Sequence, residues 1–146
     1  MDAVVLLPGQ GERIEAGALT AVMKATAATT GGAFSLSEGT VPPGVSGPPP
    51  HAHRRTTDTF YVLEGTLHLA VGGRALDAPA GSYIVVPPGV VHTFANTSAA
   101  PARVLNLNAP GGWEHYLREL ARAHGAFPGT AEFARLVAKY DFVVAA

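Results

Sequence analysis

Glycine and proline interrupt this chain at short intervals, and this spacing limits the secondary structure that the chain can form. The 146 residues include 17 Gly and 12 Pro, which separate short runs that favour β-structure. Short strands divided by turn residues are typical of an all-β sandwich or barrel. We therefore predict strands at Thr20–Ala25, Ala33–Ser37, Thr59–Leu63, Thr66–Val71, Tyr83–Val86, Val90–Ala95 and Arg103–Asn108.

Two local patterns add detail to the predicted sheets. The sequence Val71-Gly72-Gly73-Arg74 predicts a tight hairpin, because paired glycines supply the positive φ angles of a type I′ turn. In Arg103–Asn108 the leucines share one face of the strand and the asparagines share the other. This alternation is typical of a strand with one buried side.

The segment Pro42–Pro50 contains five prolines and two glycines. Such a composition is typical of a linker between domains or of a polyproline ligand for a partner. The strand-like runs on either side are too short to form separate domains. We therefore favour an extended approach to a barrel strand, within a single domain over residues 1–146.

The last third of the chain has helical periodicity instead. Apolar residues recur at i, i+3, i+4 and i+7, the spacing of one helix face, in two runs. The first run is Trp113, Tyr116, Leu117, Leu120 and Ala121, and the second is Phe133, Leu136, Val137 and Tyr140. Gly125 and Pro128 are expected to end the first helix, and Thr130 to cap the second. The predicted architecture is a β-barrel core over about residues 20–108 and two helices over about residues 113–140.

Charge and composition exclude several classes of protein. Ten Lys and Arg residues nearly balance eleven Asp and Glu residues, so the chain lacks the basic surface typical of nucleic-acid binding. It has no cysteine, which excludes disulfides, Cys-ligated zinc, iron–sulfur clusters and thiol nucleophiles. The longest apolar runs, such as Val4–Leu7, are far shorter than the ~18 residues that cross a membrane, and no basic region precedes that run as in a signal peptide. We expect a cytoplasmic protein with no nucleic-acid or membrane partner.

Three of the six histidines are candidates for a metal site. His51 and His53 are separated by one residue, so on an extended strand both imidazoles point to the same face. A half-exposed strand edge accounts for an isolated pair equally well. His92 follows a turn at residues 87–89, at the start of a predicted strand, and adds a third imidazole.

Asp58 is the candidate carboxylate of this site. It lies five residues after His53, and on one unbroken strand it would face away from both neighbouring histidines. A turn or bulge within residues 54–57 would reset the register and let the carboxylate face them. Three neutral imidazoles and one carboxylate suit a divalent first-row metal ion.

The same residues match two motifs of the cupin family, and the chain resembles small single-domain cupins. The second cupin motif, G-x5-P-x-G-x2-H-x3-N, is matched at every fixed position by Gly81, Pro87, Gly89, His92 and Asn96. The first motif, G-x5-H-x-H-x3–4-E-x6-G, reads here as His51-x-His53-x4-Asp58-x6-Gly65. Two positions depart from it: an Asp replaces the Glu, and six residues rather than five separate Gly44 from His51.

The resemblance implies a double-stranded β-helix (jelly-roll) barrel that holds one divalent metal ion, and a homodimer. Fe, Mn or Ni is favoured, and Zn is also compatible. The implied ligands are His51, His53 and His92, with Asp58 as fourth ligand and candidate catalytic residue. Asp is one methylene shorter than Glu, which retracts its oxygen by about 1.5 Å. Contact through a bridging water is therefore the alternative to direct ligation by this residue.

The suggested function is metal-dependent chemistry on a small molecule. By strand parity, four residues near the ligands are candidates to line a substrate pocket: Phe60, Val62, Phe94 and Asn96. Such an apolar lining suits an aromatic or hydrophobic compound. The resemblance to quercetin-2,3-dioxygenase-like cupins implies a dioxygenase-type oxidoreductase acting on a phenolic or flavonol-like aromatic or on an enolised diketone. The alternatives are a metal-dependent isomerase, epimerase or cyclase acting on a small carbonyl compound, and a non-catalytic small-molecule-binding cupin.

Overall fold

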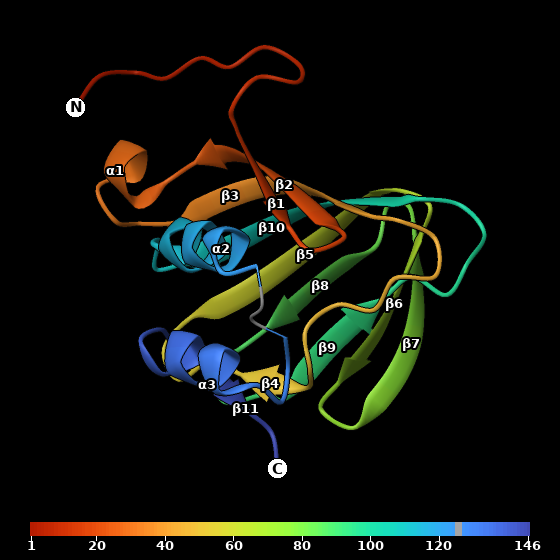
Figure 1. Ribbon diagram of the computed structural model, residues 1–146. Coiled ribbons are helices and arrows are strands. Elements are labelled where there is room, and N and C mark those ends of the chain that lie inside the picture. The colour runs from red at the N-terminus through yellow and green to blue at the C-terminus, as the bar shows by residue number, and fades with distance from the viewer. Residues whose placement is uncertain (125–126) are drawn as a thin grey trace.

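Two antiparallel β-sheets face each other in the computed structural model, which describes residues 1–124 and 127–146 (Figure 1). One sheet has six strands in the order β1-β2-β3-β10-β5-β8, and the other has five in the order β11-β4-β9-β6-β7. The strands are β1 (Glu12–Ala16), β2 (Leu19–Ala25), β3 (Ser35–Val41), β4 (His51–Ala52), β5 (Thr57–Glu64), β6 (Thr66–Val71), β7 (Arg74–Pro79), β8 (Tyr83–Val86), β9 (His92–Ala95), β10 (Ala102–Ala109) and β11 (Val143–Val144). The helices are α1 (Ala27–Thr30), α2 (Trp113–Arg122) and α3 (Ala131–Ala138). The prediction of a jelly-roll barrel followed by two helices is confirmed.

Every predicted strand overlaps a strand of the structure, whereas no strand range was predicted for β1, β4, β7 and β11. Strand β1 buries only Ile14, so its sequence shows almost no apolar alternation, and β4 and β11 are two residues long. Strand β7 is the second arm of the predicted hairpin. Gly72 and Gly73 have φ angles of 56° and 82°, and Val71 pairs with Arg74, which confirms the predicted hairpin.

The proline-rich segment runs alongside β9 and leads directly into β4. The backbone N–H of Gly47 donates to the carbonyl of Phe94 at 2.9 Å, and Ser46 forms a bridge with Ala95. This pairing confirms an extended approach to a barrel strand. It also fixes the position at which His51 enters the sheet.

Strand β10 turns its asparagine face inward. Val104 and Asn108 are buried, whereas Leu105 and Leu107 lie half-buried on the opposite face. The register with β5 places Asn108 opposite Asp58. The buried side of this strand therefore delivers amide groups to the interior, close to the candidate carboxylate.

An apolar core fills the space between the two sheets. Its buried members are Val41, Phe60, Val62, Leu67, Leu69, Ala78, Val86, Ala102 and Val104. Removing this apolar surface from water is the main favourable contribution to folding. The ring of Phe60 lies 6.4 Å from that of His92, so the core adjoins the candidate metal site.

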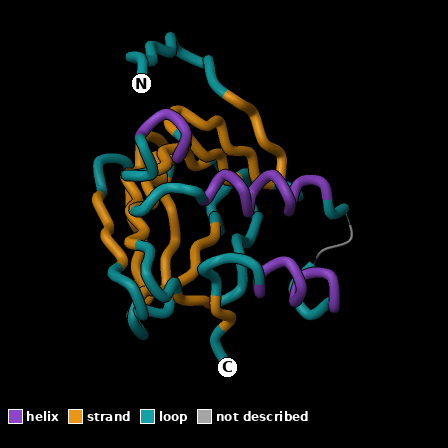
Figure 2. Tube along the Cα trace, turned by 90° about the vertical axis from the view of Figure 1, so that its left-hand side faces the viewer, coloured by secondary structure: helices purple, strands orange, loops and turns teal. Residues whose placement is uncertain are grey.

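Helices α2 and α3 lie on the same side of the strand layers (Figure 2). A second apolar cluster joins them, with Tyr116, Phe133, Leu136, Val137 and Phe142 as its buried members. Thr130 caps α3 as predicted, because its side chain accepts a hydrogen bond from the backbone N–H of Phe133. Gly125, expected to end the first helix, lies outside the described residues. None of the helices that the structure describes is long and apolar enough to cross a membrane.

Candidate metal centre

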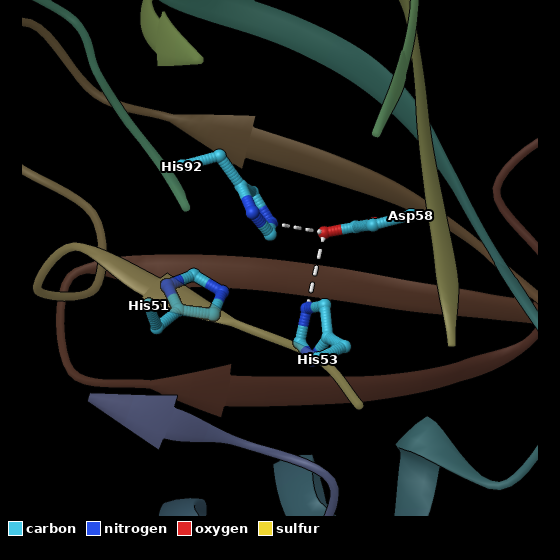
Figure 3. Close-up of side chains that lie close together, drawn as sticks. All are labelled: His51, His53, Asp58 and His92. Carbon is cyan, nitrogen blue, oxygen red and sulfur yellow. Dashed lines mark hydrogen bonds and ion pairs between the residues drawn. The ribbon is translucent and has the colours of Figure 1, made fainter. Parts of the chain in front are cut away.

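Three histidines and one aspartate meet between the two sheets, as Figure 3 shows. His51 in β4 pairs directly with His92 in β9, and His53 follows at the end of β4. Asp58 comes from β5 in the other sheet. One ligand atom from each of the four residues lies within 4.8 Å of the other three. The group predicted from the sequence is thus brought together in space.

All four side chains are removed from solvent. The exposed fractions are 3% for His51, 2% for His53, 5% for Asp58 and 2% for His92. Buried imidazoles and carboxylates without a compensating partner are unfavourable. The arrangement therefore requires either a network of hydrogen bonds or a cation among these groups.

A crossing between the sheets brings Asp58 to face the histidines. β4 belongs to the five-stranded sheet and β5 to the six-stranded sheet, so residues 54–56 carry the chain from one to the other. The sequence predicts a turn or bulge within residues 54–57, and the structure has a bend at Arg54 and Arg55. The odd offset of five residues is accommodated because the two ligands lie in different sheets.

Each histidine of the group is oriented by a backbone carbonyl. Nδ1 of His51 lies 2.8 Å from the oxygen of Pro49, and Nδ1 of His92 lies 3.0 Å from that of Val90. Nδ1 of His53 lies 2.5 Å from the oxygen of Asp141. Because a carbonyl oxygen can only accept, these contacts assign the proton to Nδ1 and leave Nε2 as the lone-pair atom in the neutral ring.

The two oxygens of Asp58 have different surroundings. Oδ1 accepts hydrogen bonds from the side-chain amides of Asn106 at 2.6 Å and Asn108 at 2.8 Å. Oδ2 faces the imidazoles, 3.0 Å from Nε2 of His92 and 3.5 Å from Nε2 of His53. Burial alone would raise the pKa of Asp58, but the hydrogen bonds that its carboxylate accepts, including that from Asn106, outweigh burial and lower the pKa to about 2.

The donor set fits a divalent metal ion. Burial lowers the pKa of His51 to about 4, so its ring is neutral near pH 7. Nε2 of His53 is buried and has no hydrogen-bond partner among the described residues. With the ring proton on Nδ1, each Nε2 can offer a lone pair, as can the ionised carboxylate of Asp58. A cation bound by three nitrogens and one oxygen would satisfy all four, and such a set suits first-row divalent ions.

Aromatic residues from the C-terminal segment cover the histidines. Phe142 stacks on His51 with ring centroids 4.2 Å apart and planes inclined by only 4°. The ring centroids of Trp113 and His53 lie 5.1 Å apart with planes inclined by 82°, and those of Tyr116 and Phe142 lie 5.6 Å apart. Trp113 and Tyr116 of the first predicted helix face therefore pack among the aromatic rings that cover the candidate metal site.

The predicted pocket-lining residues occupy different surroundings. Phe60 is next to His92, and Phe94 lies 5.9 Å from Phe60. Val62 is fully buried in the core between the sheets. The side-chain amide of Asn96 donates to two backbone carbonyls, and its oxygen accepts from a neighbouring serine. Phe60 thus lies beside His92, Val62 and Phe94 belong to or pack against the same apolar core, and Asn96 holds neighbouring backbone groups.

The sequence patterns did not predict that three further polar residues contact the proposed ligands. Asn106 and Asn108 had a signal in the alternation of β10, which can be interpreted with either face inward. Asp141 had none, because it lies 88 residues after His53. Only the folded chain brings it next to the histidines.

The chain is similar to proteins of one family over the part that carries these residues. A family model described as a cupin domain matches residues 37–108. The chain is 28% identical over 116 residues to quercetin 2,3-dioxygenase of Bacillus subtilis (strain 168), covering 80% of this chain and 34% of that protein. It is 38% identical over 71 residues to germin-like protein subfamily 2 member 2 of Arabidopsis thaliana, covering 43% of this chain and 32% of that protein. The chain thus spans about a third of the length of these two relatives.

Solved structures share the fold at lower sequence identity. KdgF from Halomonas sp. matches with a TM-score of 0.68 and 16% identity, over 78% of this chain and 99% of that one. The polyketide cyclase RemF from Streptomyces resistomycificus matches with a TM-score of 0.64 and 24% identity, over 74% of this chain and 80% of that one. A sugar phosphate isomerase of the cupin superfamily from Silicibacter pomeroyi gives 0.56 and 22%, over 63% and 59%. At these identities the similarity establishes the fold.

Proposed function

Because residues 37–108 of this chain are a cupin domain that encloses a buried group of metal-ligand type, we propose that the protein is a metal-dependent enzyme. The proposed ligands of one divalent ion are His51, His53, Asp58 and His92. Iron, manganese or nickel is favoured, and zinc is compatible with the same donors.

One observation carries this proposal. Each of the three Nδ1 atoms contacts a backbone carbonyl, so each Nε2 keeps its lone pair, and those of His53 and His92 face the carboxylate oxygen Oδ2 of Asp58. A purely structural cluster would pair each of these acceptors with a donor. The unpartnered Nε2 of His53, within the described residues, instead favours a site that a cation completes.

Dioxygenase-type oxidation is the reaction we propose, with a phenolic or flavonol-like aromatic or an enolised diketone as substrate. A bound divalent ion of this class supplies Lewis acidity and redox chemistry. Asn106 and Asn108 hold the Asp58 carboxylate in its ionised form, which favours ligation over proton transfer by this residue. Phe60, Trp113 and Phe142 surround the histidines with aromatic surface suited to a planar apolar substrate. The 28% identity to a quercetin 2,3-dioxygenase supports the same reaction class.

An isomerase, epimerase or cyclase acting on a small carbonyl compound is the second candidate. It is supported by fold-level similarity to a polyketide cyclase and to a sugar phosphate isomerase. Both candidates use the same ligands, and only the first consumes oxygen. Oxygen uptake during turnover of phenolic and diketone substrates therefore distinguishes them.

Metal content tests the proposed site directly. Metal is first removed from the purified wild type and from the variants His92→Ala and Asp58→Ala. Each protein is then reloaded anaerobically with iron, manganese, nickel or zinc, and its metal content is measured by elemental analysis. We expect near-stoichiometric metal in the wild type and its loss in His92→Ala. His68→Ala is the matched control, because His68 is half-buried in β6 outside the group and accepts from the backbone N–H of Thr97. A wild-type protein that contains no metal after reloading refutes the proposal and favours a metal-free binding module. If Asp58→Ala retains the metal, Asp58 contacts the ion through a bridging water instead.

We also propose a homodimer held by the N-terminal arm. Residues 1–10 extend away from the two sheets (Figure 1), and Val5 is 80% exposed in an apolar run at residues 4–7. Tyr61, Tyr83 and Val85 are exposed on one face of β5 and the edge strand β8. Exposed apolar residues of this kind are typical of protein interfaces. Light scattering should show that Val5→Glu converts a dimer to a monomer. Val91→Glu is the control, because Val91 is also exposed but lies outside these surfaces, and it should leave the dimer intact. A monomeric wild type would refute the proposal.

A further inference from the structure

Asp141 contacts the chain between two of the proposed metal ligands, although it lies far from both in the sequence. Its Oδ1 accepts a hydrogen bond from the backbone N–H of Arg54 at 2.5 Å. Its Oδ2 accepts from the backbone N–H groups of Arg55 and Thr56, each at 2.9 Å, and from the Thr56 hydroxyl at 2.8 Å. Four hydrogen bonds from three consecutive residues thus end on one half-buried carboxylate.

These three residues form the crossing from the five-stranded sheet to the six-stranded sheet. His53 precedes the crossing and Asp58 follows it in β5. Because both side chains must face the same point, the path of residues 54–56 determines how far Nε2 of His53 lies from Oδ2 of Asp58, 3.5 Å in the structure. A carboxylate that fixes the crossing therefore fixes the relative position of two ligands.

The backbone of the same residue contacts a ligand directly. The carbonyl oxygen of Asp141 lies 2.5 Å from Nδ1 of His53, on the side of the ring away from the proposed metal position. This contact keeps the proton on Nδ1 and the lone pair on Nε2. Partners of this kind orient metal-binding histidines and raise their basicity.

Neighbouring residues hold Asp141 in place independently of its side chain. Phe142 stacks on His51, and Val143 and Val144 of β11 pair with β4. The backbone N–H of Ala145 donates to the carbonyl of Pro50 at 2.9 Å. The segment is therefore docked on the same strand that carries the histidine pair.

We propose that Asp141 is a positioning residue of the metal centre, whose carboxylate fixes the 54–56 crossing and whose carbonyl fixes the His53 ring. The inference rests on the proposed metal site and extends it beyond residues 37–108, which the cupin family model matches. It assigns a role in metal binding to a residue outside the proposed ligand set.

Zn²⁺ affinity and the His53 tautomer test the proposal together. The affinity is measured by competition with a chromophoric chelator, and the tautomer by long-range ¹⁵N–¹H NMR of histidine rings in the metal-free protein. For Asp141→Ala we expect Zn²⁺ affinity to fall about 10–100-fold, the usual effect of losing a partner that orients a ligand. We also expect the His53 ring to change from one Nδ1–H tautomer to a mixture.

Glu114→Gln is the matched control. Glu114 is a buried carboxylate that likewise accepts from a backbone N–H, that of Ala27 at 2.7 Å, and from a hydroxyl, that of Ser35 at 2.6 Å. It should lose stability while keeping Zn²⁺ affinity and the His53 tautomer. If Asp141→Ala behaves like this control, losing stability alone, the proposal is overturned.

A milder variant covers the case in which Asp141→Ala does not fold. Thr56→Val removes only the hydroxyl hydrogen bond to Asp141 and should shift both measurements in the same direction by a smaller amount. Unchanged affinity and tautomer in a folded Thr56→Val would then overturn the proposal. Failure of the wild type to bind Zn²⁺ would refute the proposed metal site, whereas the tautomer in the metal-free protein would still decide the role of Asp141.

Discussion

Removing the asparagine amides that hold Asp58 should weaken both the fold and the metal centre. Asn106 and Asn108 each donate to Oδ1 of Asp58, at 2.6 Å and 2.8 Å. We consider Asn108→Ala, Asn106→Ala and the double variant, all measured first without metal. The carboxylate stays buried in each variant, so it loses donors without gaining water.

The expected magnitude follows from the charge on the acceptor. A hydrogen bond to a charged group contributes about 1.5–3 kcal/mol, so each single variant should lose roughly 2 kcal/mol of unfolding free energy. The double variant should lose about 1 kcal/mol more than the sum, because Oδ1 is then left with no donor.

The sign of the pH dependence gives a further check. The folded-state pKa of Asp58 is lowered, so its contribution to stability is fully present above the ordinary pKa of 3.8 and declines as pH falls toward 2. The difference between wild type and Asn106→Ala in urea unfolding should therefore shrink over this range. In Zn²⁺ competition at neutral pH, the same variant should bind about tenfold more weakly.

Asn96→Ala is the control for this experiment. Asn96 is fully buried, and its amide donates to the backbone carbonyls of Val41 and Ala100 rather than to Asp58. It should lose stability with Zn²⁺ affinity unchanged. The reasoning fails if the double variant at Asn106 and Asn108 loses less than about 0.5 kcal/mol, or if it binds Zn²⁺ as tightly as the wild type.

Three further predictions concern stability. Hydrogen bonds outweigh burial and lower the pKa of Glu114, so Glu114→Gln should lower the free energy of unfolding in urea at pH 7 by about 1–3 kcal/mol. The difference in stability between the wild type and this variant should decline as pH falls below the ordinary pKa of 4.5. Phe142→Ala removes a 4%-exposed ring from the second apolar cluster and from its stack on His51, so unfolding free energy should fall by about 3–5 kcal/mol. Thermal melting should show that Gly65→Ala is far more destabilising than Gly73→Ala, although both glycines have positive φ. A Cβ added at Gly65 would lie 2.3 Å from the carbonyl oxygen of Pro101, whereas a Cβ added at Gly73 would meet nothing within 4 Å.

Local patterns were sufficient to predict the histidine pair and the helices. The spacing of His51 and His53 places them on one face because strand parity depends on neighbouring residues alone. The apolar period of the C-terminal segment predicts α2 and α3 for the same reason, and Thr130 is positioned by its own sequence context. The grouping of the four proposed ligands is confirmed, while their role in binding stays a prediction.

The inward-facing asparagines of β10 show that an alternating pattern alone does not predict which face of a strand is buried. An alternation of Leu and Asn in β10 predicts one buried side, and burial of apolar surface would favour the leucines. The structure turns Asn108 inward, where its side-chain amide donates to the buried carboxylate of Asp58 on the paired strand. Only the identity of the opposite residue decides which face is buried, and strand pairing is not readable from one segment.

Asp141 marks a second limit. Its hydrogen bonds depend on where α3 ends and on the pairing of β11 with β4, neither of which a local motif determines. Asp58 could be placed only conditionally, since the sequence indicates a needed change of register but not that the chain changes sheet. The predicted pocket residues Val62 and Asn96 likewise follow strand parity, which does not distinguish a pocket from a packed core.

The separation of 88 residues between His53 and Asp141 also affects the order in which the centre forms. Closing a loop of that length costs about 4 kcal/mol of chain entropy, so this contact is expected late in folding. Until it forms, the His53 ring lacks the carbonyl that selects its tautomer, and metal capture should lag behind formation of the sheets. Trp113 is the only tryptophan in the sequence, and its ring lies 6.2 Å from that of Phe142, next to Asp141. Its fluorescence therefore reports, without any added label, the step at which the centre becomes competent to hold an ion.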